Sequence, residues 1–165
     1  MRHRSAALLA LTLAAALPGC SNTPTVPSGI ARAVITVAVD PTPVPIGTST
    51  TSIGLHQAKY KVVVTETAGL GGEFVRIDST IFDDTTGLSM GINNYDAADL
   101  VVFVGSKRLE ASQKVEIAQQ IDFVLPADFK GARIAVSVQF RDDRANVLNQ
   151  SILVVATVPT VPTAP

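Results

Sequence analysis

ARIAVSVQFR, residues 132–141, decides the fold class of this chain. Ile134, Val136, Val138 and Phe140 alternate there with arginine, alanine, serine and glutamine. Because successive side chains of a β-strand point to opposite faces, the apolar set faces a core and the other set faces water. The stretch therefore predicts a strand in a sheet that is buried on one face.

The same kind of pattern recurs on both sides of this stretch. Further strands are expected at residues 31–39, 60–64, 73–82, 100–104, 115–125 and 147–156. Segments rich in Pro, Gly and Asp separate them, as turns require. No capped amphipathic helix is predicted, and at most one helical turn is expected near Tyr95–Ala98. About seven strands joined by short loops predict an all-β fold, a two-sheet antiparallel β-sandwich.

The opening and closing strands of this pattern carry a resemblance to a known family. Ile35–Val44, followed by Tyr60–Thr65 and a glycine turn, looks like the opening strands of bacterial immunoglobulin-like or fibronectin-type-III-like domains, and Gly131–Val155 is similar to their closing hairpin. The resemblance covers roughly residues 30–157. The chain lacks the cysteine pair and the tryptophan of antibody domains, since it has one Cys and no Trp. The resemblance implies an immunoglobulin-like sandwich that binds, spaces or assembles other molecules.

The first 20 residues have the parts of an export signal. Met1–Arg4 is basic, Ala6–Leu17 is apolar, and Leu17-Pro18-Gly19-Cys20 follows. This motif resembles the lipobox of bacterial lipoproteins, in which the cysteine is lipidated and becomes the mature N-terminus. The resemblance implies membrane attachment through Cys20 in the cell envelope, and Ser21 after it favours the outer membrane. The alternative is an ordinary secretory signal cleaved near residues 14–16, which leaves Cys20 as a thiol.

These signals divide the chain into four segments. We expect a signal peptide at 1–19, a tether rich in Pro, Ser and Thr at 20–29, one domain at 30–157 and a disordered tail at 158–165. Cleavage before Cys20 removes Arg2 and Arg4 from 13 basic residues and nothing from 14 acidic ones, so the net charge becomes about −3. The charges are mixed in sign along the chain, which argues against a nucleic-acid partner.

The sequence contains few candidate catalytic and metal-binding residues, and no cofactor is expected. His56 is the single histidine after cleavage, and a Ser-His-acid triad would have to combine it with Ser52 or Ser89. No Gly-x-Ser-x-Gly context marks either serine as a nucleophile. Asp83, Asp84, Asn93 and Asp96 could offer oxygen ligands to calcium, although such residues also favour turns for purely local reasons.

Three functions from different classes remain open. The first is a non-enzymatic, membrane-anchored lipoprotein whose domain binds another envelope protein or assembles with it. Its candidate interaction loop is 83–99, with Met90, Ile92 and Tyr95. The second is a carbohydrate-binding module on the same anchor, for which Tyr95, Phe82 and Phe129 are the aromatic residues that could stack on sugars. The third is a small hydrolase that uses acidic residues of the loops.

Overall fold

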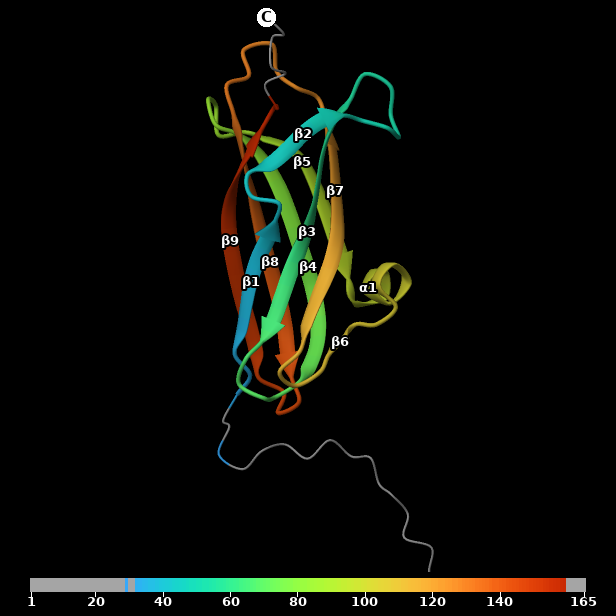
Figure 1. The fold of residues 1–165 in the computed structure, drawn as a ribbon, viewed down its shortest axis with the longest axis vertical. Helices are drawn as coiled ribbons and strands as arrows, with labels where there is room; N and C mark the ends of the chain where they lie inside the picture. The colour runs from blue at the N-terminus through green and yellow to red at the C-terminus, as the bar shows by residue number, and fades with distance from the viewer. Residues whose placement is uncertain (1–28, 30–31, 160–165) are drawn as a thin grey trace, which may run out of the picture.

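The computed structural model describes residue 29 and residues 32–159, and within them the chain forms nine β-strands and one α-helix (Figure 1). The lipobox with Cys20, the signal peptide and nearly all of the expected tether lie outside the described residues, as does the tail beyond Pro159. The domain is all-β in character, with a sandwich-like arrangement of strands. The prediction of a β-rich sandwich is confirmed at this level.

The strands form two layers. One layer contains β1 (Ile35–Asp40), β3 (His56–Glu66) and β7 (Lys114–Phe123), with β3 in the middle and antiparallel to both neighbours. The other contains, in spatial order, β9 (Val147–Thr157), β8 (Ala132–Asp142), β4 (Gly72–Asp83) and β5 (Ser89–Asp96), all antiparallel. The two-residue β6 (Arg108–Leu109) adds to the start of β4.

The strand β2 (Val44–Thr48) joins the two layers into one mixed sheet. Its first two residues pair with the end of β9 in parallel, and Ile46–Thr48 pair with the start of β3 in antiparallel fashion. The prediction of a purely antiparallel sheet is therefore wrong at this point. β1 and β2 follow each other along the same side of β3, and the chain changes layer at the Pro-rich link between them.

The core lies between the layers and follows the alternation in the sequence. Ile134, Val136, Val138 and Phe140 are completely buried, whereas Arg133 and Arg141 of the same strand are exposed. Phe140 packs edge-on against Phe74 with ring centroids 5.5 Å apart. Each such side chain contributes roughly 1.5–3 kcal/mol when it leaves water. Valine and isoleucine supply most of the remaining core, as the composition requires.

The prediction of a strand at 100–104 is wrong, because these residues belong to the helix α1 (Ala97–Val104). The Asp96 side chain accepts hydrogen bonds from the backbone N–H of Ala98 and Asp99, and the Asp99 side chain accepts one from the N–H of Asp96. This is a reciprocal capping box, and Gly105 ends the helix in the left-handed conformation. The expectation of at most one turn is therefore also wrong. An apolar run of five residues does not by itself distinguish a strand from a helix.

The expected number of strands was about seven, and the described residues contain nine. Six of the seven predicted strands are present, and β2, β5 and β6 were not predicted. β5 occupies half of the segment 83–99 that was interpreted as a loop, and its Gly and Asn residues hide the alternation. Gly91 is needed there, because a Cβ would lie 2.8 Å from Ile121 Cγ2 of β7. The glycine lets β5 and β7 approach where the two layers meet.

Candidate functional site

The outer face of the layer β5-β4-β8-β9 is the first candidate surface. Residues that oppose one another in neighbouring strands point to the same side of a sheet, so the pairing register defines its rows. The first row holds Ser89, Phe82, Arg133 and Val155; the second holds Ile92, Thr80, Ala135 and Leu153; the third holds Asn94, Asp78, Ser137 and Ser151; the fourth holds Asp96, Arg76, Gln139 and Asn149.

Most residues of the first two rows form an apolar surface, which we call the apolar half-face: Thr80, Phe82, Ile92, Ala135, Leu153 and Val155. Ser89 and the exposed Arg133, which pairs with Asp84, are the polar members of the first row, and Arg133 lies between Phe82 and Val155. Ile92, Leu153 and Val155 are 60%, 55% and 50% exposed. Thr80 and Ala135 are small and lie between Ile92 and Leu153, so the middle of the row is lower than its sides. A contiguous apolar surface of this kind is typical of an interaction site, whereas single exposed apolar residues are not.

The third and fourth rows are polar, so the face changes from mainly apolar to polar between the second row and the third. Ser151 Oγ lies 3.2 Å from Ser137 Oγ, and Arg76 Nε donates to Asp78 at 2.5 Å. One end of the face is therefore solvated in the ordinary way. Because the same four strands carry both halves, strand formation alone does not explain the apolar half.

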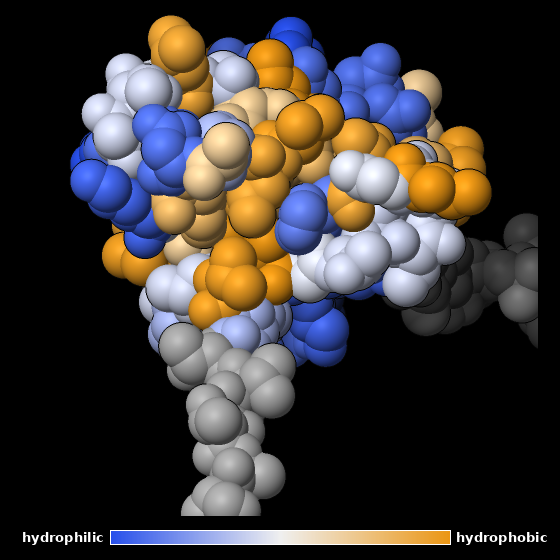
Figure 2. Space-filling view, turned by 90° about the horizontal axis from the view of Figure 1, so that it is seen from above, coloured by the Kyte–Doolittle hydropathy of each residue, from blue (hydrophilic) through white to orange (hydrophobic). Residues whose placement is uncertain are grey.

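The loops at the top of Figure 1 form a second apolar surface, which we call the loop end. Its exposed apolar side chains are Ile53, Leu88, Val124 and Val158, and Ile53 is fully exposed. Figure 2 looks onto this end and shows hydrophobic residues gathered across its middle. Leu88 directly precedes β5, and Val158 follows β9 by one residue. The loop end therefore borders the first row of the apolar half-face.

The three predicted interaction residues have different environments. Ile92 is exposed and belongs to the apolar half-face, whereas Met90 and Tyr95 are half-buried against the core. The Tyr95 ring stacks on Phe103 of α1 with centroids 5.2 Å apart. Val102 and Phe103 on the same helix are 76% and 65% exposed. The structure thus places Tyr95 beside a helical apolar surface, and only Ile92 on the sheet face.

The opposite end of the molecule is polar and is organised by buried carboxylates. Glu66, 1% exposed, accepts hydrogen bonds from five backbone N–H groups. The donors are Val34, Ala68, Gly69, Leu70 and Ser112, at 2.8–3.3 Å. Burial alone would raise the pKa of Glu66, but these hydrogen bonds outweigh it and lower the pKa below its usual value. One side chain therefore holds the start of β1 and two loops together.

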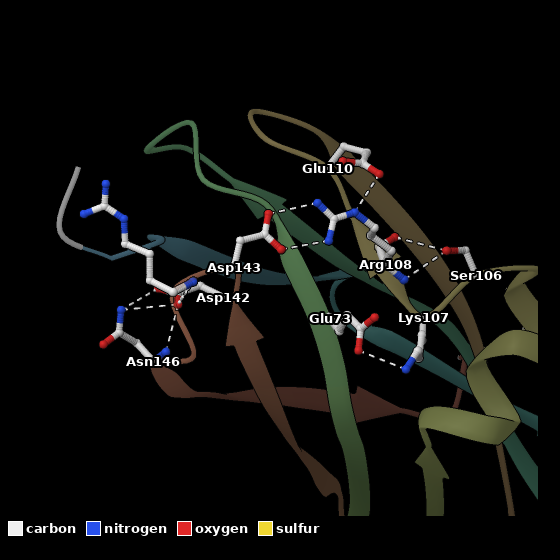
Figure 3. A network of polar contacts seen from close by, with 9 residues as sticks. Glu73, Ser106, Lys107, Arg108, Glu110, Asp142, Asp143 and Asn146 are labelled. Atoms are coloured by element: carbon white, nitrogen blue, oxygen red, sulfur yellow. Dashed lines mark hydrogen bonds and ion pairs between the residues drawn. The ribbon is translucent and has the colours of Figure 1, made fainter. Parts of the chain in front are cut away.

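Asp142 has the same role at the β8–β9 turn. Its carboxylate accepts from the backbone N–H of Ala33, Arg144 and Asn146 and from the Asn146 side chain, at 2.8–3.2 Å (Figure 3). Burial would raise its pKa, and these hydrogen bonds lower it instead. We call the region around Glu66 and Asp142 the carboxylate end.

An ion-pair network covers the carboxylate end. Arg108 bonds both carboxylate oxygens of Asp143, at 2.8 and 2.9 Å, and also Glu110 at 2.8 Å (Figure 3). Lys107 pairs with Glu73 at 2.9 Å. Hydrogen bonding to Asp143 raises the pKa of Arg108 and lowers that of Asp143. The acidic groups here position loops, which is a structural role.

His56 lies at the start of β3 and its ring is 6.4 Å from that of Phe123. Its Nδ1 atom is buried and has no hydrogen-bond partner among residues 32–159. A catalytic triad needs an acid at one imidazole nitrogen and a nucleophile at the other. Nδ1 has neither partner, so the geometry around His56 is not that of an assembled triad.

The four candidate calcium ligands are used in different contacts. Asp83 accepts from the backbone and hydroxyl of Thr86, Asp84 pairs with Arg133, and Asn93 donates to Gln119 at 2.8 Å. Asp96 caps α1. Among the described residues, no group of three or more His, Cys, Asp or Glu side chains could hold a metal ion.

The three aromatic residues considered for sugar stacking do not share a surface. Phe82 is half-buried in the apolar half-face, Phe129 is packed against the core, and Tyr95 is stacked on Phe103. The apolar half-face itself was missed, although Ile152–Ala156 gives a signal for it. That run is continuously apolar instead of alternating, which means that both faces of the strand are apolar.

The fold and its surfaces define a β-rich, sandwich-like domain. No family model and no curated protein matches the sequence. Among solved structures, the chain is similar to a protein called ApaA from Bordetella pertussis, with 13% identity, 78% of this chain and 97% of that chain covered, and a TM-score of 0.54. It is also similar to structural genomics target SoR45, with 9% identity, coverage of 74% and 86%, and a TM-score of 0.52. At such identities the similarity concerns the fold alone.

Membrane-spanning helices are a separate question. In the part of the chain that the structure describes, no helix has the length and apolar character needed to cross a bilayer.

Proposed function

We propose that this protein is a bacterial envelope lipoprotein, attached to the membrane through lipid on Cys20, whose immunoglobulin-like domain binds another envelope protein. The lipobox Leu17-Pro18-Gly19-Cys20 supports the anchor. Two or more acyl chains on one cysteine hold a protein on a membrane almost permanently. The outer membrane is the favoured location because Ser21 follows the cysteine.

The strand order supports the immunoglobulin-like part of the proposal. With the short strands β2 and β6 set aside, β1, β3 and β7 take the positions of strands A, B and E, and β4, β8 and β9 take those of C, F and G. β5 lies beside β4, at the edge that variable-type domains fill with strand C′. This assignment requires no disulfide, which agrees with the cysteine count.

The apolar half-face is the single observation that carries the binding role. Ile92, Leu153 and Val155 are exposed on the surface of a sheet whose other half is polar. A partner protein that covers them removes apolar surface from water at roughly 25 cal/mol per Å². The small residues at the centre of this face suit a partner that presents apolar side chains on a regular surface, such as a helix or a second sheet.

Cell fractionation tests the anchor. The Cys20→Ser variant should move from the membrane fraction to the soluble fraction, while Ser21→Ala should remain with the membrane. Retention of Cys20→Ser in the membrane would contradict lipidation at this residue.

Site-specific photocrosslinking in cells tests the binding role. A photoreactive residue at position 153 should capture one dominant envelope protein, and the same residue at position 151, in the polar half of the same strand, should capture it far less. Equal products at the two positions would mean that the apolar half-face is not the interface. A deletion of residues 92–97 would be a poor test of partner binding, because it removes most of β5 and the cap of α1.

A further inference from the structure

A groove lies on the outer face of the other layer, over β3 and β7. Its volume is about 480 Å³, which falls in the range of small-molecule sites. Its lining includes Asp40, Pro41, Lys59, Lys61, Ala118 and Gln120. The groove is separate from the apolar half-face, which lies on the opposite layer, and it serves none of the contacts described above.

The strand register explains why there is a hollow here. Asp40 of β1 opposes Lys61 of β3, and Lys61 opposes Ala118 of β7. Lys59 opposes Gln120 one position further along the same face. Since alanine has a single methyl group, the surface is low at Ala118, and Pro41 and the lysine stems surround it with apolar atoms.

The charged groups of the groove have capacity to bind a ligand. Within the described part of the chain, no ion pair includes Lys59 or Asp40, and the Lys59 ammonium bonds the Thr50 hydroxyl at 3.2 Å. Lys61 bonds Glu116 at 2.9 Å, but Lys114 bonds the other oxygen of Glu116 at the same distance. A ligand could therefore take Lys61 while Glu116 keeps a cation.

We propose that this groove binds a sugar ring that carries a carboxylate. Lys59 and Lys61 bind the carboxylate, a ring hydroxyl donates to Asp40, and the C–H face of the ring lies over Ala118 and Pro41. A ligand with a carboxylate and no hydroxyls would leave Asp40 facing a like charge. A neutral sugar would add no anion to Lys59 beyond the nearby Asp122. A ligand with both groups complements the lysines and Asp40 together.

Amide NMR spectra of the full chain in detergent test the proposal with three probes. D-galacturonate carries both groups, D-galactose lacks the carboxylate, and cyclohexanecarboxylate lacks the hydroxyls. We expect galacturonate to shift signals of residues 59–61 and 118–120 with a Kd at least about threefold lower than that of either other probe. Raising the salt concentration should weaken its binding, because the lysines are exposed. Equal affinities for the three probes, or shifts scattered over the surface, would overturn the proposal.

Two variants assign the roles of the charged groups. Lys59→Gln combined with Lys61→Gln should remove the preference for galacturonate over galactose, whereas Lys130→Gln, an exposed lysine outside the groove, should retain it. Asp40→Asn should raise the affinity for cyclohexanecarboxylate toward that for galacturonate, because the repulsion is gone. An unchanged preference in the double variant would show that the lysines do not select the ligand.

Discussion

The loops at the two ends of the molecule are held in place by different contacts. Both ends consist of loops that connect the strands of the two layers. At the carboxylate end, Glu66 and Asp142 are buried and bind the backbone N–H groups of the loops. At the loop end, Asp122 remains near the surface and bonds the side chains of Ser49, Thr51 and Gln120, while Ile53 and Leu88 are exposed. The loop end also contains one buried carboxylate, Asp83, which binds Thr86. The two ends therefore differ in degree: the carboxylate end has two such carboxylates, and the loop end carries the larger set of exposed apolar side chains.

The largest expected effect is that of removing the carboxylate of Glu66. Glu66→Ala leaves five backbone N–H groups, one buried and four partly buried, without their acceptor, which should lower the free energy of unfolding by about 3–5 kcal/mol. Asp122→Ala is the matched control at the loop end and should cost less than about 1 kcal/mol, because its partners can turn to water. Urea unfolding of the two variants measures the difference. If the two variants lost equal amounts of unfolding free energy, the carboxylates at the two ends would stabilise the fold to the same extent.

Glycine substitutions test packing at the two ends. A Cβ at Gly72 would lie 2.7 Å from Asp142 Cα and from the ring of Phe140, so Gly72→Ala should cost about 2–3 kcal/mol. A Cβ at Gly47 of β2 would meet no atom of the described residues within 4 Å, and Gly47→Ala should change the free energy of unfolding by less than about 0.5 kcal/mol. Thermal unfolding of both variants is the measurement. A neutral Gly72→Ala would mean that the strands around Asp142 can shift.

Much of the layered fold could be predicted from the sequence, because alternation reports burial on one face. The strand at 132–142 appears as expected, with Ile134 and Phe140 buried. α1 could not be found from periodicity, since its signal is the pair Asp96 and Asp99 with Gly105 rather than an amphipathic stripe. The apolar half-face was even harder to predict from the sequence than α1. Ile92 is a candidate because of its place in segment 83–99. Leu153 and Val155 of the same face come from a strand about 60 residues away in the chain, and only the pairing register shows that they share this face.

The pH dependence of stability tests the role of the Asp142 carboxylate. Its pKa in the folded protein lies below the unfolded value of about 3.9, so its contribution is complete above that pH and is lost as the pH falls through the folded pKa. As the pH falls from about 6 to about 3, the native protein should therefore lose more of its free energy of unfolding than Asp142→Asn does. Asp128→Asn, at an exposed position, should follow the native protein. Parallel curves for all three proteins would contradict a role for the Asp142 carboxylate in acid stability.

The smallest change in the free energy of unfolding is expected for substitutions at the loop end. A small change is informative there, because it would show that the exposed apolar side chains do not stabilise the fold. Ile53→Ser combined with Leu88→Ser replaces two side chains that are exposed to water. The free energy of unfolding in urea should therefore change by less than about 0.5 kcal/mol. If the loop end extends the apolar half-face, the same variant should lower the yield of the crosslink from position 153 by at least about threefold. Gln113→Ser, an exposed loop residue near the carboxylate end, is the control and should lower neither quantity. A loss of stability above about 1 kcal/mol would show that Ile53 and Leu88 are structural, and an unchanged yield would confine the interface to the sheet face. Because the native loops already expose these apolar side chains to water, their replacement by serine costs the fold almost nothing, and a loss of crosslinking can then come only from the partner.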